Sequence, residues 1–244
     1  MSVMKEEEII KKFTNRRFTT KELFKFYNEL ENGELKQTTF RWRVYHLKEQ
    51  GVIRSVSRGV YEIGPEKLFI PTLSKDAKRI FRKLKKEFPY VDFVIWETEW
   101  LNNFMVHQPS TMNIIVEVES NLINDVFNFL YLNEKNVVFA PRDNTSASYM
   151  LKDGYSTIVS PLVLHKPTMQ LDKFVIPKIE AIIVDLFIDE IILMPYQGKE
   201  KANILENLFN EYTVKRSTIR QYAGKRGVLN KVLGFLSEET NIIF

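Results

Sequence analysis

The sequence contains no cysteine, and this absence removes two kinds of site at once. Disulfides and thiolate metal centres are both excluded, which is typical of proteins in a reducing cytoplasm. Long apolar runs are missing as well, since none approaches the roughly 18 residues that a membrane helix requires. The first residues, MSVMKEEEIIKKF, are too polar for a secretory signal. We therefore expect a soluble, cytoplasmic protein without a membrane partner.

Several catalytic motifs are missing too. The sequence has no phosphate loop of the GxxxxGK[ST] or GxGxxG type, and no serine stands in a nucleophile elbow. A nucleotidyltransferase would need a Gly-Ser turn followed by paired carboxylates, and no Gly-Ser pair exists. The three histidines, His46, His107 and His165, do not show metal-ligand spacing. We therefore expect no enzymatic activity, no cofactor and no metal.

One group of carboxylates invites a nuclease interpretation. Glu117 and Glu119 stand at the end of a predicted strand, and Asp92 lies in a neighbouring one. Restriction-type nucleases place a lysine two residues beyond the metal-binding acid, on the same face of the strand. Position 119 is glutamate instead, so the pattern argues against a nuclease.

Positive charge is unevenly distributed, although the net charge is only +4. A locally basic segment marks a possible nucleic-acid surface more reliably than net charge does, but it can equally be a solvated helix face. Three segments qualify, and they are residues 36–58, 75–86 and 213–231.

The first 64 residues have the pattern of a winged helix-turn-helix. Helices are predicted over residues 6–13, from the capping-box threonine Thr19 onward, and from Gln37 to the residue before Gly51. In the third helix, Phe40, Val44 and Leu47 form the predicted core stripe. Two short strands follow, at 52–55 and 60–63, joined by a basic turn at 57–59.

A recognition helix contacts bases and phosphates with its outer face, and the wing contacts the backbone or minor groove. Glutamine and arginine suit base edges, because each can make two hydrogen bonds there. We therefore predict a DNA-binding domain over residues 1–70. Its candidate DNA contacts are Lys36, Gln37, Thr38, Thr39, Arg41, Trp42, Arg43, His46, Arg54, Ser57 and Arg58.

Residues 71–244 are predicted to form a mixed α/β domain with a helical C-terminal part, so the fold class is α+β. Ser74 caps a basic helix that ends before Pro89, and Pro177 is placed at the first turn of a later helix. Strands are predicted within 90–96, 112–118, 137–140 and 155–164. Helices are predicted within 98–105, 121–132, 176–186, 199–212, 217–222 and 228–236.

Two alternatives remain open. The N-terminal domain could be a protein–protein module, which an acidic surface over residues 37–46 would favour. The C-terminal domain could sense a ligand or be an enzyme, with the winged helix as its regulator. A cleft lined by Trp96, Trp100, His107 and Glu117 would favour that second alternative.

Two regions together resemble a known family. The wing sequence SRGVY at 57–61, the segment PKIEAIIVDL at 177–186, and YAGKRG at 222–227 with LGFL at 233–236 are similar to the AbiEi-type antitoxin regulators. These belong to bacterial type IV abortive-infection toxin–antitoxin systems. The resemblance covers residues 18–64 and 176–237 and is weak over 90–165, where only His107 corresponds to the family's His-Gly pair.

The resemblance implies a cytoplasmic repressor that binds double-stranded promoter repeats of its own operon. It also implies that the C-terminal domain counters a nucleotidyltransferase-like toxin, generally without a tight complex. The candidate residues of this antitoxin-like domain are Asp185, Arg220, Lys225 and Arg226.

Overall fold

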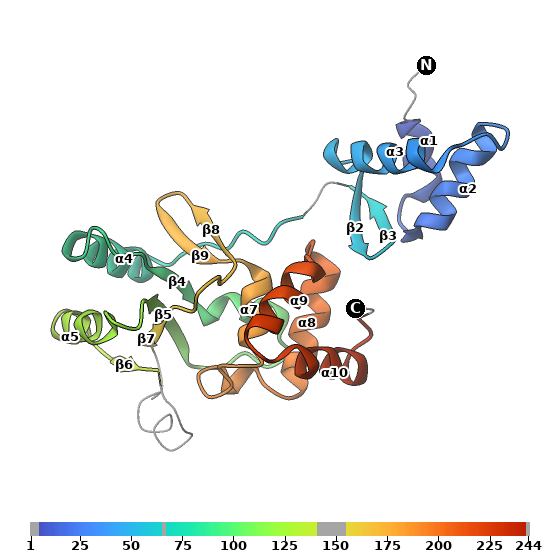
Figure 1. The fold of residues 1–244 in the computed structure, drawn as a ribbon. Coiled ribbons are helices and arrows are strands. Elements are labelled where there is room, and N and C mark those ends of the chain that lie inside the picture. Colours follow the sequence, from blue (N-terminus) through green and yellow to red (C-terminus); the bar gives the residue numbers. More distant parts are fainter. Residues whose placement is uncertain (1–4, 65–66, 141–154, 243–244) are drawn as a thin grey trace. The chain divides into compact units, whose positions relative to one another are not determined.

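The computed structural model describes residues 5–64, 67–140 and 155–242 of a mixed α+β fold (Figure 1). It divides into two compact units. The first unit comprises residues 1–69, 208–214 and 242–244, and the second comprises 70–207 and 215–241. Within the described ranges, no helix combines the length and the apolar character needed to cross a bilayer.

Residues 5–64 of the first unit form three helices and a small antiparallel sheet. Its elements are α1 (Glu6–Phe13), β1 (Phe18–Thr19), α2 (Thr20–Leu30), α3 (Gln37–Glu49), β2 (Ile53–Ser57) and β3 (Val60–Ile63). The strand order is β1-β3-β2, so β3 lies in the middle. The predicted helices and the hairpin are therefore confirmed, and β1 is an additional strand.

The predicted capping box at the start of α2 is confirmed. The backbone N–H of Glu22 donates to Thr19 Oγ1 at 3.2 Å, and the backbone N–H of Thr19 donates to Glu22 Oε2 at 2.7 Å. Both bonds satisfy donors that the first helical turn leaves free. The same arrangement holds the pKa of Glu22 at about 2, chiefly through the Thr19 backbone hydrogen bond.

The turn of the β2–β3 hairpin is attached to the first residue of α2. Gly59 has a φ of +74°, which favours glycine, and a Cβ there would lie 3.0 Å from Thr20 Oγ1. The Gly59 carbonyl accepts hydrogen bonds from Thr20 N (2.7 Å) and Thr20 Oγ1 (3.1 Å). The helix start therefore fixes the turn of the β2–β3 hairpin.

A distant segment completes the first unit. Thr213 N donates to the Lys67 carbonyl at 2.8 Å, and Lys67 N donates to Thr213 Oγ1 at 3.2 Å. Arg17 donates to Asn210 Oδ1 at 3.0 Å. The domain boundary predicted at residue 70 did not include residues 208–214, which belong to this unit.

The second unit is built on a four-stranded sheet of order β4-β5-β7-β6. β4 is antiparallel to β5, whereas β5, β7 and β6 are parallel. Helix α4 packs beside β4, and α5 packs beside β6 and β7. The elements are α4 (Lys75–Glu87), β4 (Val94–Glu97), the 3-10 helix η1 (Thr98–Phe104), β5 (Met112–Val118), α5 (Ile123–Asn133), β6 (Val137–Phe139) and β7 (Tyr155–Pro161).

A hairpin and a group of helices follow the sheet. They comprise β8 (Thr168–Leu171), β9 (Phe174–Pro177), α7 (Ile179–Asp185), η2 (Met194–Tyr196), α8 (Lys199–Glu211), α9 (Arg216–Lys225) and α10 (Leu229–Glu239). The expected position of Pro177 in a helix was wrong, because Pro177 ends β9 and α7 begins two residues later. The β8–β9 hairpin was missed, since its tight turn uses Asp172 at a φ of +53° without the usual glycine.

Candidate functional site

The outer face of α3 carries basic and aromatic side chains in solvent. Arg41 is exposed, and so are Trp42 (52%) and Tyr45 (59%). The Trp42 ring contacts the His46 ring, with centroids 4.1 Å apart. Lys36, Gln37 and Thr38 are exposed at the start of the helix, and Thr39 is half-buried. These predicted DNA contacts therefore share one accessible surface.

Arg43 does not belong to this surface, so its placement among the outward-facing residues was wrong. Its side chain is 6% exposed, forms an ion pair with Glu31, and lies over the Tyr27 ring at 4.8 Å. Position 43 is three residues after Phe40 and four before Leu47, so it falls on the buried stripe of the helix. Val44, which was expected in that stripe, is only partly buried.

The two arginines of the hairpin also differ, because one is ion-paired and the other is exposed without a described partner. Arg54 is ion-paired with Glu62, and its Nη1 donates to the Glu211 carbonyl at 3.2 Å. Arg58 lies exposed at the turn, beside the half-buried Ser57. Among the described residues, neither Arg41 nor Arg58 has a hydrogen-bond or ion-pair partner for its side chain. Of the four arginines among the predicted DNA contacts, two therefore lack a partner in the described part of the chain, and two have carboxylate partners.

The four candidate residues of the antitoxin-like domain do not form one group. Asp185, at the end of α7, lies 3.7 Å from Arg226, just after α9, measured from Oδ1 to Nη1. Arg226 also donates to the Tyr222 hydroxyl at 2.8 Å. Arg220 and Lys225 are exposed on α9 and do not join them.

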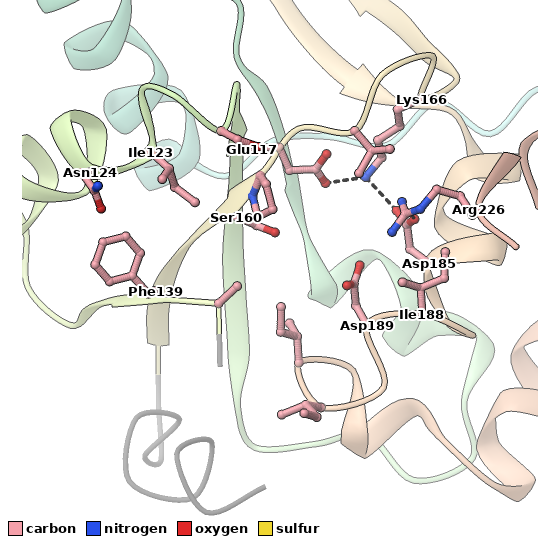
Figure 2. Close-up of a pocket in the computed structure, with 16 residues that line it drawn as sticks. Glu117, Ile123, Asn124, Phe139, Ser160, Lys166, Asp185, Ile188, Asp189 and Arg226 are labelled. Atoms are coloured by element: carbon pink, nitrogen blue, oxygen red, sulfur yellow. Dashed lines mark hydrogen bonds and ion pairs between the residues drawn. The ribbon is translucent and has the colours of Figure 1, made fainter. Parts of the chain in front are cut away.

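In the structure, Asp185 forms a charged cluster with Lys166 and Glu117. The sequence patterns did not predict this grouping. Lys166 lies between the carboxylates of Glu117 and Asp185, and Figure 2 shows its ammonium directed toward both. Its Nζ is 2.7 Å from Asp185 Oδ2 and forms a second ion pair with Glu117. Trp96 Nε1 donates to Glu117 Oε1 at 3.0 Å. All three charged side chains are at most 6% exposed.

Burial and charge act against each other in this cluster. Burial lowers the pKa of Lys166, but the carboxylates of Asp185 and Glu117 outweigh it, and the net shift is upward. Burial and the nearby Asp185 raise the pKa of Glu117, although Lys166 opposes them. The lysine is therefore charged, and it compensates two buried acids. Among the described residues, no three histidine, aspartate or glutamate side chains form a metal-binding group.

The cluster borders a cavity of about 880 Å³ (Figure 2). Glu117 and Ser160 are register partners near the carboxyl ends of the parallel strands β5 and β7, and Phe139 ends β6. Asp185, Asp189 and Arg226 line the other side. A crevice at the carboxyl ends of parallel strands is where open α/β sheets commonly bind ligands.

The cleft of Trp96, Trp100, His107 and Glu117 that would have favoured a ligand-sensing or enzymatic second domain does not form. Both tryptophans are buried, whereas His107 is exposed and its Nδ1 lies 2.8 Å from Glu200 Oε1. Only Glu117 reaches the cavity.

Sequence reasoning missed Lys166 and Asp189. Lys166 lies in an irregular connection and meets Glu117 across 49 residues of chain, so no spacing pattern marks it. The only sequence signal for Asp189 was its position shortly after an apolar helix that ends in an acidic residue. The lysine that the nuclease interpretation required beside Glu117 is present in space, but the exposed Asp92 is not among the cavity residues.

Comparison with known proteins gives one family and no named relative. No curated protein matches the chain. One family model, described as a family of unknown function (DUF6577), matches residues 39–242, which include most of α3, the hairpin and every charged residue of the cavity. Because this match covers well over half of the sequence, the chain belongs to the DUF6577 family of unknown function.

Proposed function

We propose that the protein is a DNA-binding transcriptional regulator whose first unit binds double-stranded DNA. The observation that carries the proposal is the exposed face of α3, where Arg41 has no described partner and lies beside exposed Trp42 and Tyr45. The only acidic residue of α3 is Glu49, at its last position. A solvent-exposed cationic and aromatic helix face of this kind suits a phosphate backbone and the groove beside it.

The arrangement of the first unit supports an interpretation as a winged helix-turn-helix. Three helices are followed by a β-hairpin, and the hairpin turn is held by hydrogen bonds between Gly59 and Thr20. In such a domain, Gln37 and Thr38 at the start of α3 would reach base edges, and Arg41 and Arg58 would contact phosphates. Arg43 and Arg54 would instead stabilise the domain, because both have carboxylate partners.

The role of an AbiEi-type antitoxin is the specific regulator that we propose. The resemblance of the wing, of the α7 region and of the last two helices supports it, and it implies autorepression at promoter repeats. The second unit would then counter a nucleotidyltransferase-like toxin. Co-expression with the product of each adjacent gene tests this role: the chain should restore growth that one of these products inhibits. If neither product is toxic, or the chain rescues neither, the antitoxin role is wrong.

Binding to the protein's own upstream DNA tests the DNA-binding proposal. We expect Arg41→Ala and Arg58→Ala each to weaken binding and to reduce the slope of log K against log salt by about 1, because each removes one phosphate contact. Fluorescence anisotropy with a labelled duplex at two salt concentrations measures both effects.

Arg82→Ala is the matched control, because Arg82 is an exposed arginine on α4 of the second unit. It should bind DNA like the unaltered protein. Wild-type affinity in both the Arg41 and the Arg58 variants would remove α3 and the hairpin as the DNA surface.

A further inference from the structure

The cavity in the second unit has an unequal charge balance. Three carboxyl groups line it, from Glu117, Asp185 and Asp189, whereas the lining cations are Lys166 and Arg226. Both cations already have partners: Lys166 contacts Glu117 and Asp185, and Arg226 contacts Tyr222 and lies close to Asp185. An incoming anion would have to compete with these internal carboxylates.

Among the described residues that line the cavity, Asp189 is the charged group without a hydrogen-bond or ion-pair partner for its side chain. Its backbone N–H donates to the Asp185 carbonyl at 2.8 Å, which fixes the turn after α7. Its carboxylate has no hydrogen-bond or ion-pair partner among the described residues, and Figure 2 shows it on the cavity side, below the Lys166 cluster. A carboxylate held in this way in a partly desolvated site favours a positively charged partner.

The rest of the cavity is largely apolar. Ile123 begins α5 and Phe139 ends β6, whereas Ile188, Ile191 and Ile192 come from the segment between α7 and η2. The volume of about 880 Å³ falls within the range that encloses small organic ligands. Ser160 provides a further polar group beside Glu117.

We propose that this cavity binds a small organic cation, a protonated amine on an apolar body, with the Asp189 carboxylate as its counter-ion. The ammonium group would occupy the position beside Asp189 where the charge balance lacks a cation. The apolar body would contact the isoleucines and Phe139. This site is independent of the proposed DNA surface, which lies in the other unit.

Three ligands of similar shape and different charge test the proposal on the full chain at pH 8. They are 2-phenylethylamine, which is cationic, 2-phenylethanol, which is neutral, and 3-phenylpropanoate, which is anionic. Calorimetric titration should show the amine binding about 10-fold more tightly than either other ligand, since a charge-assisted hydrogen bond contributes roughly that factor.

Asp189→Asn should weaken amine binding about 10-fold and leave binding of the alcohol unchanged. Asp189→Glu keeps the charge and should retain the preference for the amine. Asp172→Asn is the matched control, because Asp172 is exposed in the β8–β9 turn and asparagine tolerates its positive φ.

Amine binding should also depend on pH. Asp189 faces Asp185 from α7, Glu117 from β5, Lys166 from the connection after β7 and Arg226 after α9; burial first, and then Asp185, raise the pKa of Asp189 to about 7. Binding should therefore strengthen as pH rises through this value. Failure of the amine to bind, equal affinity for amine and alcohol, or unchanged amine binding in Asp189→Asn would each overturn the proposal.

Discussion

Lys166 is the residue on which the charge balance of the second unit depends. It lies in an irregular connection, yet its side chain is 4% exposed and its ammonium compensates two carboxylates from different elements. A buried ion pair of this kind adds little net stability, because desolvation offsets the attraction. Removing the central cation is different, because it leaves two buried acids without compensation.

We therefore expect Lys166→Met to destabilise the second unit by about 3 to 5 kcal/mol, the usual effect of breaking a buried pair. Urea denaturation followed by tryptophan fluorescence reports on this unit, because Trp96 and Trp100 are buried in it. Lys178→Met is the control, since Lys178 is exposed before α7 and should unfold like the unaltered protein. Equal losses in both variants would contradict a central role for Lys166.

Asp189 should make the stability of the protein depend on pH. Its pKa in the folded state is raised to about 7, so the folded protein holds a proton there that the unfolded chain has already released. Stability should therefore fall as pH rises from about 4 to about 7, and then level off.

Asp189→Asn should remove this fall. At pH 8 the variant should be more stable than the unaltered protein by about 1 to 2 kcal/mol, a value reduced from the full pKa shift because solvent reaches the carboxylate. At pH 4 the two proteins should unfold alike. Thermal denaturation at both pH values makes the comparison, and a variant that is less stable at pH 8 would show that the carboxylate stabilises the fold.

Among the elements, α2 shows how local sequence determines a helix start. Thr19 and Glu22 exchange hydrogen bonds across the first turn, and this capping box was recognisable from their spacing alone. The same reasoning located Ser74, whose hydroxyl accepts from Ala77 N at 3.1 Å at the start of α4. Both caps depend on residues within one turn of each other, so the sequence contains all the information they need.

Thr19→Ala should lower the stability of the α2 start by about 1 kcal/mol, because the backbone N–H of Glu22 loses its acceptor, Thr19 Oγ1. Amide hydrogen exchange should be about five-fold faster in the first turn of α2, which corresponds to that energy. Thr72→Ala, at an exposed position outside any helix or strand, should leave these rates unchanged. Unchanged exchange in Thr19→Ala would mean that tertiary packing alone holds the helix start.

Elements that depend on distant residues were harder to predict. Hydrophobic periodicity located the strand at 112–118 with its observed ends, but it could not show that Glu117 would meet Lys166 and Asp185. The face of Arg43 was misjudged because its partner, the partly exposed Glu31, lies on the preceding connection and compensates the charge of the buried guanidinium. In each case the missing information is an ion pair that tertiary packing creates. Hydrophobic periodicity in the sequence does not reveal such a pair.

At the scale of the whole molecule, the core of the first unit is formed by residues close in sequence. Its buried cluster extends from Ile9 to Ile53, and Tyr61 and Ile63 pack against it. Residues 208–214 contribute hydrogen bonds and ring contacts beside the hairpin and are not part of that cluster.

A fragment of residues 1–69 should therefore fold by itself, although it lacks one segment of its unit. We expect a cooperative thermal transition by circular dichroism, at a lower temperature than in the full chain, because small domains bury less of their surface. The same fragment with Phe40→Ala should lose the transition, since Phe40 is 3% exposed in the core. A fragment without cooperative melting would show that residues 208–214 are required for folding.

The return of residues 208–214 to the first unit also constrains how this protein can be recombined. The chain passes from one unit to the other after residues 69, 207, 214 and 241, so no single junction separates them. Helix α8 begins in the second unit and ends in the first. A gene fusion that exchanged residues 1–69 for a foreign DNA-binding module would leave the end of α8 facing a surface that it does not match. Exchange of the first unit would thus require residues 1–69 and 208–214 to be replaced together, which favours divergence of the whole chain over domain shuffling.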